Sequence, residues 1–222
     1  SSAASDVYKR QVHHAPHRPG DAGLWHLLET ARTNFFAPPG VVESLEKELQ
    51  VGPCGEEVAT FEPTYAMYQQ IARTTQCKVI EGARDSQYRV ALSEVEKVVA
   101  RDHPNIIFFC SPNNPTGTPE RLEVIEGALK ISDGVVVVDE AYGQFADFTA
   151  LDLLRGDEAA DSLIVTRTFS KTWSMAGARL GYCVAPSWIL PEIEKVDLPY
   201  HLDSVKQIAA RVALRFYGDM EE

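Results

Sequence analysis

The sequence has no long apolar run and no excess of basic residues, and each absence excludes a class of protein. The densest apolar runs, 106–110 and 135–138, are strand-sized, whereas a transmembrane helix needs about 20 apolar residues. Lys and Arg number 21 against 32 Asp and Glu, so the formal net charge is -11 at pH 7. Nucleic acids and anionic membranes favour a basic face. We therefore expect a soluble protein whose main partner is neither of them.

Cysteine is scarce, and its spacing excludes the common disulfide and zinc motifs. Cys54, Cys77, Cys110 and Cys183 form no C-x-x-C pair, and no histidine stands beside them at a metal-ligand spacing. We interpret them as reduced packing residues. Because the sequence also has no apolar core of a signal peptide, we expect a cytoplasmic protein.

The first part of the chain, 1–50, has little pattern. A low-complexity start is followed by a stretch rich in His, Pro and Arg, and weak helical periodicity over 21–33 and 41–50 predicts two short helices. We interpret 1–50 as an atypical leader, artefactual or disordered. Three histidines in it resemble a metal cluster but have no acidic or cysteine partner at a suitable spacing, so we predict a solvated segment and no metal site. They are His13, His14 and His17.

From about residue 51, apolar strand-like runs alternate with amphipathic helical stretches. This alternation is typical of an α/β protein in which helices flank a mostly parallel sheet. Strands are predicted at 58–61, 78–81, 105–110, 135–138, 163–166 and 182–185. Helices are predicted at 66–74, 93–103, 119–131 and 202–217.

Local patterns also predict how these helices begin and pack. Thr64 is expected to cap the first helix, and Ser93 with Glu96 forms a capping-box signature at the second. The last helix closes the fold and carries an apolar face. That face consists of Val205, Ile208, Ala209, Val212 and Phe216.

Lys171 is the residue around which we predict the functional site. It follows the β-branched run 163–166 and has Thr168 and Ser170 beside it, which is unlike the surroundings of a solvated lysine. This pattern indicates a Schiff-base lysine that holds an aldehyde cofactor, with Ser170 and Arg179 binding the cofactor's phosphate. The alternative is a lysine that extends to solvent from a strand end and an ordinary ion-pairing arginine.

Three polar loops, 111–117, 139–142 and 168–179, each follow a predicted strand. In open α/β sheets, ligands bind outside the carboxyl ends of the strands. The three loops would therefore share one crevice if their strands are neighbours.

The motifs in these loops are Ser-Pro-Asn-Asn-Pro-Thr-Gly, Asp-Glu-Ala-Tyr, and Ser-Lys with an arginine eight residues after the lysine. Together they resemble the class I and II pyridoxal-phosphate aminotransferases of fold type I. The segments 61–68, 166–171 and 198–202 look most like bacterial histidinol-phosphate aminotransferases. The likeness runs from about Gly52 to the end of the chain.

The resemblance implies a chemical role for five side chains. Lys171 would form the Schiff base with pyridoxal 5′-phosphate and later move a proton between substrate and cofactor. Asp139 would keep the pyridine nitrogen protonated. Asn114 and Tyr142 would hydrogen-bond the phenolic oxygen of the cofactor, and Tyr65 would stack on its ring.

For the phosphate, the resemblance implies Thr168, Ser170 and Arg179 as binding residues. Tyr200 and His201 are left out of the site. For three of the site residues named above, an ordinary structural role stays open. Asp139 could cap a turn at a strand end, Asn114 could be a turn residue before proline, and Tyr65 could be a core tyrosine.

The sequence departs from the family in two places. The glycine-containing phosphate loop is not recognisable within 41–55, and the substrate-binding arginine belongs to a small C-terminal domain that would lie beyond Glu222. We therefore expect 51–222 to be a partial pyridoxal-phosphate-binding large domain, with the small domain largely absent.

The resemblance implies a transaminase of L-histidine biosynthesis. It would convert histidinol phosphate and 2-oxoglutarate into imidazole-acetol phosphate and glutamate, and the full-length protein would be a homodimer. An aromatic-amino-acid aminotransferase and a phosphothreonine decarboxylase-like enzyme have the same three loops and remain alternatives. Two further alternatives are a catalytically incomplete cofactor-binding fragment and an acidic α/β interaction module without chemistry.

Overall fold

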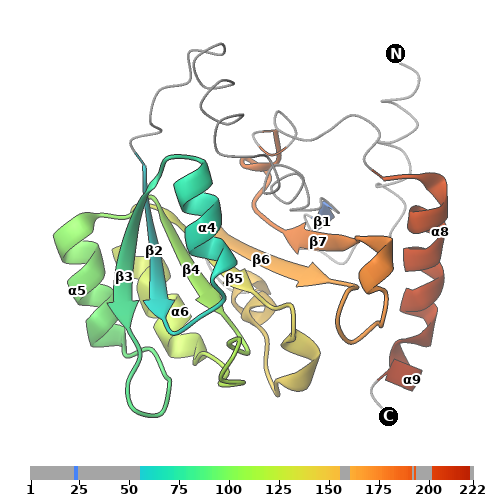
Figure 1. The fold of residues 1–222 in the computed structure, drawn as a ribbon, viewed down its shortest axis with the longest axis horizontal. Coiled ribbons are helices and arrows are strands. Elements are labelled where there is room, and N and C mark those ends of the chain that lie inside the picture. Colours follow the sequence, from blue (N-terminus) through green and yellow to red (C-terminus); the bar gives the residue numbers. More distant parts are fainter. Residues whose placement is uncertain (1–22, 25–55, 156–160, 192, 194–201, 221–222) are drawn as a thin grey trace.

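A mostly parallel sheet forms the centre of the computed structural model, which describes residues 23–24, 56–155, 161–191, 193 and 202–220 (Figure 1). Its strand order is β1-β7-β6-β5-β4-β2-β3. Neighbours from β3 across to β6 run parallel, whereas β7 is antiparallel to both β6 and β1. The strands are β1 (Gly23–Leu24), β2 (Glu57–Glu62), β3 (Lys78–Ala83), β4 (Ile106–Cys110), β5 (Val135–Asp139), β6 (Leu163–Thr168) and β7 (Gly181–Val184).

Helices connect the parallel strands and cover both faces of the sheet, as the predicted α/β class requires. Successive side chains of a strand point to opposite faces. Phe109 of β4 belongs to the core that α5 and α6 cover, while its neighbour Phe108 stacks on Tyr68 of α4, on the other face. The helices are α4 (Met67–Thr74), α5 (Leu92–Asp102), α6 (Leu122–Ile131), α8 (Ser204–Ala213) and α9 (Tyr217–Met220).

The main core lies between the sheet and the pair α5 and α6. Phe61 and Phe109 stack there with ring centroids 5.2 Å apart, and Val95 and Val98 of α5 pack against them in the same cluster. A Cβ atom at Gly82 would stand 2.5 Å from the Phe61 ring, so β3 needs a glycine where it passes this stack.

Both predicted helix starts are wrong in their capping details. Helix α5 begins two residues earlier than the capping box predicts: its N-cap is Ala91 in place of Ser93, and no side chain caps it. Helix α4 has Ala66 as its N-cap, again without a side-chain bond, because the Thr64 hydroxyl instead donates to Asn113 Oδ1 at 2.7 Å. A tertiary partner has replaced the local one.

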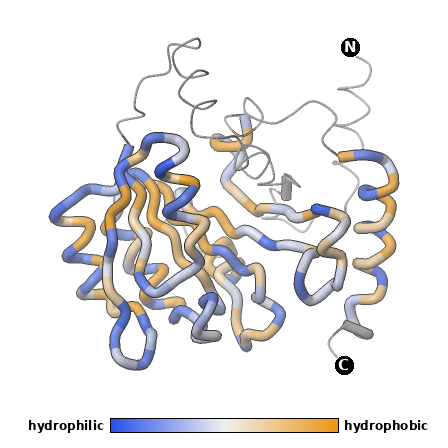
Figure 2. Tube along the Cα trace, in the orientation of Figure 1, coloured by the Kyte–Doolittle hydropathy of each residue, from blue (hydrophilic) through white to orange (hydrophobic). Residues whose placement is uncertain are grey.

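The predicted last helix, 202–217, is divided and packs through a different face: α8 begins at Ser204, and the 3-10 turn Leu214–Phe216 joins it to α9. Helix α8 is capped by Asp203, whose carboxylate accepts the Lys206 N–H at 2.9 Å. Figure 2 shows apolar residues recurring along α8. The residues that were predicted to form its apolar face are largely exposed; for example, the exposed fraction of Val205 is 75%. The cluster around Phe169 and Leu180 is contacted instead by Ala210 and Ala213 of α8 and by Leu202, which precedes the helix.

Several predictions fall outside the described residues. The histidine cluster, the predicted helix over 41–50 and the rest of the predicted leader 1–50 lie there, except for Gly23–Leu24. These two residues fall within the predicted helix over 21–33, but they form the strand β1. Within the part of the chain that the structure describes, no helix is long and apolar enough to span a bilayer.

Candidate active site

Polar side chains gather at the carboxyl ends of neighbouring strands. β4 pairs with β5 and β5 with β6, so the loops 111–117, 139–142 and 168–179 leave the sheet from three adjacent strands. In the register, Asp139 stands between Cys110 and Thr166. The condition for a shared crevice, that the three strands are neighbours, is met.

Asp139 ends β5 as a half-buried carboxylate held by three donors. The Tyr68 hydroxyl donates to Oδ2 at 2.7 Å, the Ala141 N–H donates to Oδ1 at 2.9 Å, and the Thr166 hydroxyl also bonds the carboxylate. Burial raises the pKa of Asp139 above its ordinary value, while these three hydrogen bonds act in the opposite direction. The carboxylate is therefore oriented by fixed donors before any ligand arrives.

Tyr68 is a site residue that the sequence reasoning missed. It is buried in α4, and its ring stacks on Phe108 with centroids 4.9 Å apart. It also makes a T-shaped contact with the Tyr65 ring, with centroids 5.6 Å apart. Burial, followed by the charge of Asp139, raises the pKa of Tyr68 well above its ordinary value, so its hydroxyl keeps its proton and donates. The spacing of three residues from Tyr65 to Tyr68 is the signal that could have found it.

The two asparagines of the 111–117 loop have different environments. Asn113 is buried and fixes the loop, because its Nδ2 donates to Pro63 O at 3.0 Å and to Thr116 Oγ1 at 2.9 Å. The N–H of Asn114 donates to Cys110 Sγ at 3.4 Å, and its half-buried side chain has no hydrogen bond within the described part of the chain. Asn114 is thus the asparagine that can bind a ligand.

Cys110 is a packing residue, as its sequence context indicated. Burial raises the pKa of its thiol to about 11, so the thiol stays neutral. Its Sγ lies beneath the loop, 3.6 Å from Pro112 O. Cys77 and Cys183 are likewise reduced cysteines, and Cys54 lies outside the described residues.

Lys171 and Tyr142 come together across the ends of β6 and β5. The Lys171 side chain is exposed, and its Nζ lies over the Tyr142 ring, 5.2 Å from the centroid. A cation at this distance is attracted to the ring face. Beside it, the Thr172 hydroxyl oxygen is buried and has no hydrogen-bond partner within the residues that the structure describes.

Backbone contacts form the turn that carries Thr168 and Ser170. The Thr168 hydroxyl accepts the Ser170 N–H at 3.0 Å and donates to Leu180 O at 3.3 Å. Arg179 stands just before Leu180 with a left-handed backbone, φ 50°, and its Nη1 donates to Ala176 O at 3.0 Å. The structure therefore brings Thr168 and Ser170 together and places Arg179 in the strand-to-strand connection beside them.

A second missed feature joins the 139–142 loop to β6. Glu140 is buried, and its Oε2 accepts Arg167 Nη2 at 2.6 Å and Nε at 3.0 Å. The Ala150 N–H and the Thr149 hydroxyl complete its hydrogen bonds. A two-bond guanidinium–carboxylate contact of this kind fixes geometry as well as charge, so it holds the loop after Asp139 against the strand that leads to Lys171.

The predicted residues thus form linked groups at one edge of the sheet. Tyr65 connects to Asp139 through Tyr68, and Lys171 meets Tyr142 three residues after Asp139. A reactive amine, an oriented carboxylate, hydroxyls and a guanidinium are the donor types that an aldehyde cofactor with a basic ring nitrogen and a phosphate requires. Together with the unpartnered Thr172 hydroxyl, they fit pyridoxal 5′-phosphate.

The curated proteins that are similar to this chain include several histidinol-phosphate aminotransferases. The chain is 43% identical over 188 residues to the histidinol-phosphate aminotransferase of Paenarthrobacter aurescens, covering 82% of this chain and 50% of the relative. It is 39% identical over 201 residues to that of Thermobifida fusca, covering 89% of this chain and 53% of the relative. The chain thus spans about half the length of the curated relatives it matches.

Solved structures share the fold. A putative histidinol-phosphate aminotransferase from Erwinia carotovora matches with a TM-score of 0.71 and 22% identity, over 90% of this chain and 56% of that one. The enzyme of Sinorhizobium meliloti, solved in complex with pyridoxal-5'-phosphate, matches with a TM-score of 0.69 and 18% identity, over 97% of this chain and 69% of that one. These similarities confirm the fold type I architecture.

The family assignment follows from the extent of the match. A model of the family "Aminotransferase class I and II" matches residues 25–222, which extends the likeness well before Gly52, where the resemblance was expected to begin. The matched range contains β2 to β7 and all three polar loops. This chain belongs to the class I and II aminotransferase family.

Proposed function

We propose that this chain carries the cofactor-binding part of a pyridoxal-phosphate transaminase that acts on histidinol phosphate. The observation that carries the proposal is the position of Lys171, over the Tyr142 ring and in the loop after β6, the strand next to the one that ends in Asp139. The identity of 35% to 43% to relatives named histidinol-phosphate aminotransferase supports the substrate. The proposed reaction converts histidinol phosphate and 2-oxoglutarate into imidazole-acetol phosphate and glutamate, in L-histidine biosynthesis.

Lys171 and Asp139 would carry the chemistry. The cofactor, when bound, supplies a ring that accepts electrons from a bond broken at the substrate carbon. Lys171 would hold the cofactor through its amine and, once displaced by the substrate amine, would move the proton from the substrate carbon to the cofactor. Asp139 pairs with the ring nitrogen, and the Tyr68 hydroxyl keeps its carboxylate in place.

The other predicted residues would bind and orient. Tyr65 covers the ring face, and Asn114 and Tyr142 donate hydrogen bonds to the phenolic oxygen, which favours its anionic form. Thr168, Ser170 and Arg179 hold the phosphate, which is the group for which a guanidinium has matching geometry.

Other activities of the family remain to be separated by experiment. An aromatic-amino-acid aminotransferase and a phosphothreonine decarboxylase-like enzyme would use the same cofactor residues. A catalytically incomplete fragment would bind the cofactor without turnover, and an acidic interaction module would bind none. The cytoplasmic location, expected from the cysteines and the lack of a signal-peptide core, and the homodimer, implied by the resemblance, both stay predictions.

The test is a transamination assay of the purified protein with 2-oxoglutarate as amino acceptor. We expect a higher kcat/KM with histidinol phosphate than with phenylalanine, and a loss of about 10²- to 10⁴-fold in Lys171→Ala, which removes the acid–base group. Lys130→Ala, on the exposed side of α6, is the matched control and should behave as the unmodified protein. A preference for phenylalanine would contradict the proposed substrate, and full activity of Lys171→Ala would contradict the mechanism.

A further inference from the structure

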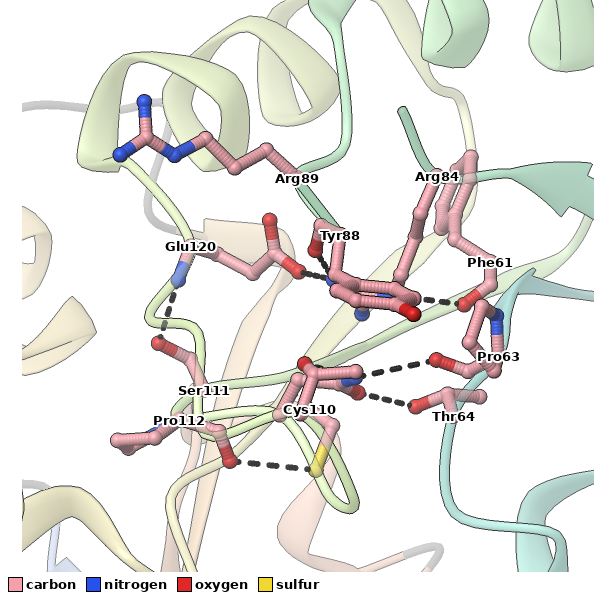
Figure 3. A network of polar contacts seen from close by, with 12 residues as sticks. Phe61, Pro63, Thr64, Arg84, Tyr88, Arg89, Cys110, Ser111, Pro112 and Glu120 are labelled. Atoms are coloured by element: carbon pink, nitrogen blue, oxygen red, sulfur yellow. Dashed lines mark hydrogen bonds and ion pairs between the residues drawn. The ribbon is translucent and has the colours of Figure 1, made fainter. Parts of the chain in front are cut away.

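A buried ion pair lies beneath the two loops that carry Tyr65 and Asn114, and the proposed chemistry does not use it. Arg84 follows β3 and Glu120 precedes α6, and Nη1 of the arginine contacts Oε1 of the glutamate (Figure 3). Both side chains are only 1% exposed. Charges removed from water in this way persist only when their hydrogen bonds are satisfied.

Arg84 also donates hydrogen bonds to two backbone carbonyls. Its Nε donates to Phe61 O at 2.9 Å, and its Nη1 donates to Tyr88 O at 3.0 Å. Phe61 is the penultimate residue of β2, just before the segment 62–65. The guanidinium therefore fixes the end of the strand from which Tyr65 departs.

Glu120 holds the other loop. Its N–H donates to Ser111 Oγ at 3.1 Å, so the first and last residues of the 111–120 loop are joined, and Figure 3 shows this closure beside the ion pair. The Val90 backbone also bonds the Glu120 carboxylate. Burial raises the pKa of Glu120 above its ordinary value, and the charges of Arg84 and Arg121 oppose that rise.

The two loops are joined a second time nearer to the site. The Thr64 hydroxyl donates to Asn113 Oδ1 at 2.7 Å, and Asn113 Nδ2 donates to Pro63 O at 3.0 Å. The segment 62–65 and the 111–120 loop are therefore joined at two places, and the ion pair is the one further from the site. Tyr65 and Asn114 are the residues next to these contacts.

A purely stabilising role does not require charges here. Well-packed apolar residues often replace a buried ion pair without loss of stability, whereas the planar fork of a guanidinium fixes several partners in one geometry. We propose that Arg84 and Glu120 are positioning residues that hold Tyr65 and Asn114 at the separation that the pyridoxal-phosphate ring requires. This inference rests on the proposed function.

The expected consequence of breaking the pair can be observed without turnover. If Asn114 withdraws, the phenolic oxygen of the cofactor loses a donor, and its negative charge then holds the proton on the nitrogen linked to Lys171 more tightly. The pKa of that nitrogen rises, and the pH midpoint of the cofactor's visible absorbance change rises with it. The other ionisable groups near it, Tyr142, Asp139 and Arg179, stay the same in every variant.

The test compares Arg84→Met/Glu120→Leu with a matched control on α6, Lys130→Met/Glu126→Leu, which removes an exposed ion pair. We expect the first variant to raise the absorbance midpoint by about one pH unit, which corresponds to one hydrogen bond of ordinary strength. The control should keep the midpoint of the unmodified protein. The unfolding temperature, measured in parallel, shows whether a variant with a changed midpoint has also lost stability.

Arg84→Lys keeps the result decisive if the double variant does not fold, because it retains the charge but not the planar fork. We expect it to raise the midpoint as well, at an unchanged unfolding temperature. Midpoints equal to that of the unmodified protein in all folded variants would overturn the positioning role and leave the proposed function intact. If the unmodified protein shows no cofactor band, the proposed function fails and this inference fails with it.

Discussion

Among the three donors to Asp139, the Tyr68 hydroxyl is the one whose removal most directly tests how the pKa of this carboxyl is set. Burial raises the pKa of this carboxyl, and the Tyr68 hydroxyl at 2.7 Å lowers it. Tyr68→Phe removes the hydroxyl but keeps the ring that stacks on Phe108. Because the pKa of Asp139 then rises further, the acid limb of the pH dependence of kcat/KM should move to higher pH.

A pH–rate profile checks this prediction, with Tyr88→Phe as control because the Tyr88 side chain is half exposed. The control should keep the acid limb where it is. An acid limb that does not move in Tyr68→Phe would show that Tyr68 does not tune Asp139. A change in unfolding temperature alone would point to packing as its only role.

At the scale of elements, helix starts give a stability prediction. Ser93 lies inside α5 and is not its cap, whereas Asp203 caps α8 with its carboxylate. Replacing a capping side chain with alanine costs about 1 kcal/mol, and a surface change away from such a feature costs less than about 0.5 kcal/mol. Asp203→Ala should therefore lower the free energy of unfolding more than Ser93→Ala, as urea titration will measure. The reverse order would contradict the observed caps.

The same elements show what local sequence can predict. The strands of the parallel sheet were predictable because apolar runs such as 106–110 form its buried interior. The start of α4 was not, because the hydroxyl of Thr64 is taken by Asn113, which is 49 residues away in sequence. For α8, the apolar pattern was real, but alanines such as Ala210 make the inner contact.

The candidate site also contains residues that the sequence could predict and residues that it could not. The motif residues at strand ends, such as Asp139 and Lys171, could be named because loop sequences carry them, although their proposed roles await experiment. The Arg84–Glu120 pair could not, because its two residues come from distant elements and only the fold brings them together. For Tyr68 the sequence offers only its spacing from Tyr65, and its bond to Asp139 comes from the fold.

At the scale of the whole molecule, the strand order explains why one sheet edge carries the candidate site. The neighbours β4, β5 and β6 run parallel and deliver Asn114, Asp139 and Lys171 from their carboxyl ends. The ion pair Arg84–Glu120 ties β2 and β3 to this edge from one side, and Glu140–Arg167 ties β5 to β6. We propose that this arrangement makes Lys171 the lysine that binds the cofactor.

The most direct measurement is borohydride reduction of the purified protein with pyridoxal 5′-phosphate, followed by peptide mapping. Reduction converts a Schiff base into a stable secondary amine, so the cofactor's mass stays on the lysine that bound it. We predict that the label lies on Lys171, well above the exposed Lys97 and Lys130, and disappears in Lys171→Ala. Equal labelling of all three lysines, or a label that persists in Lys171→Ala, would contradict the account.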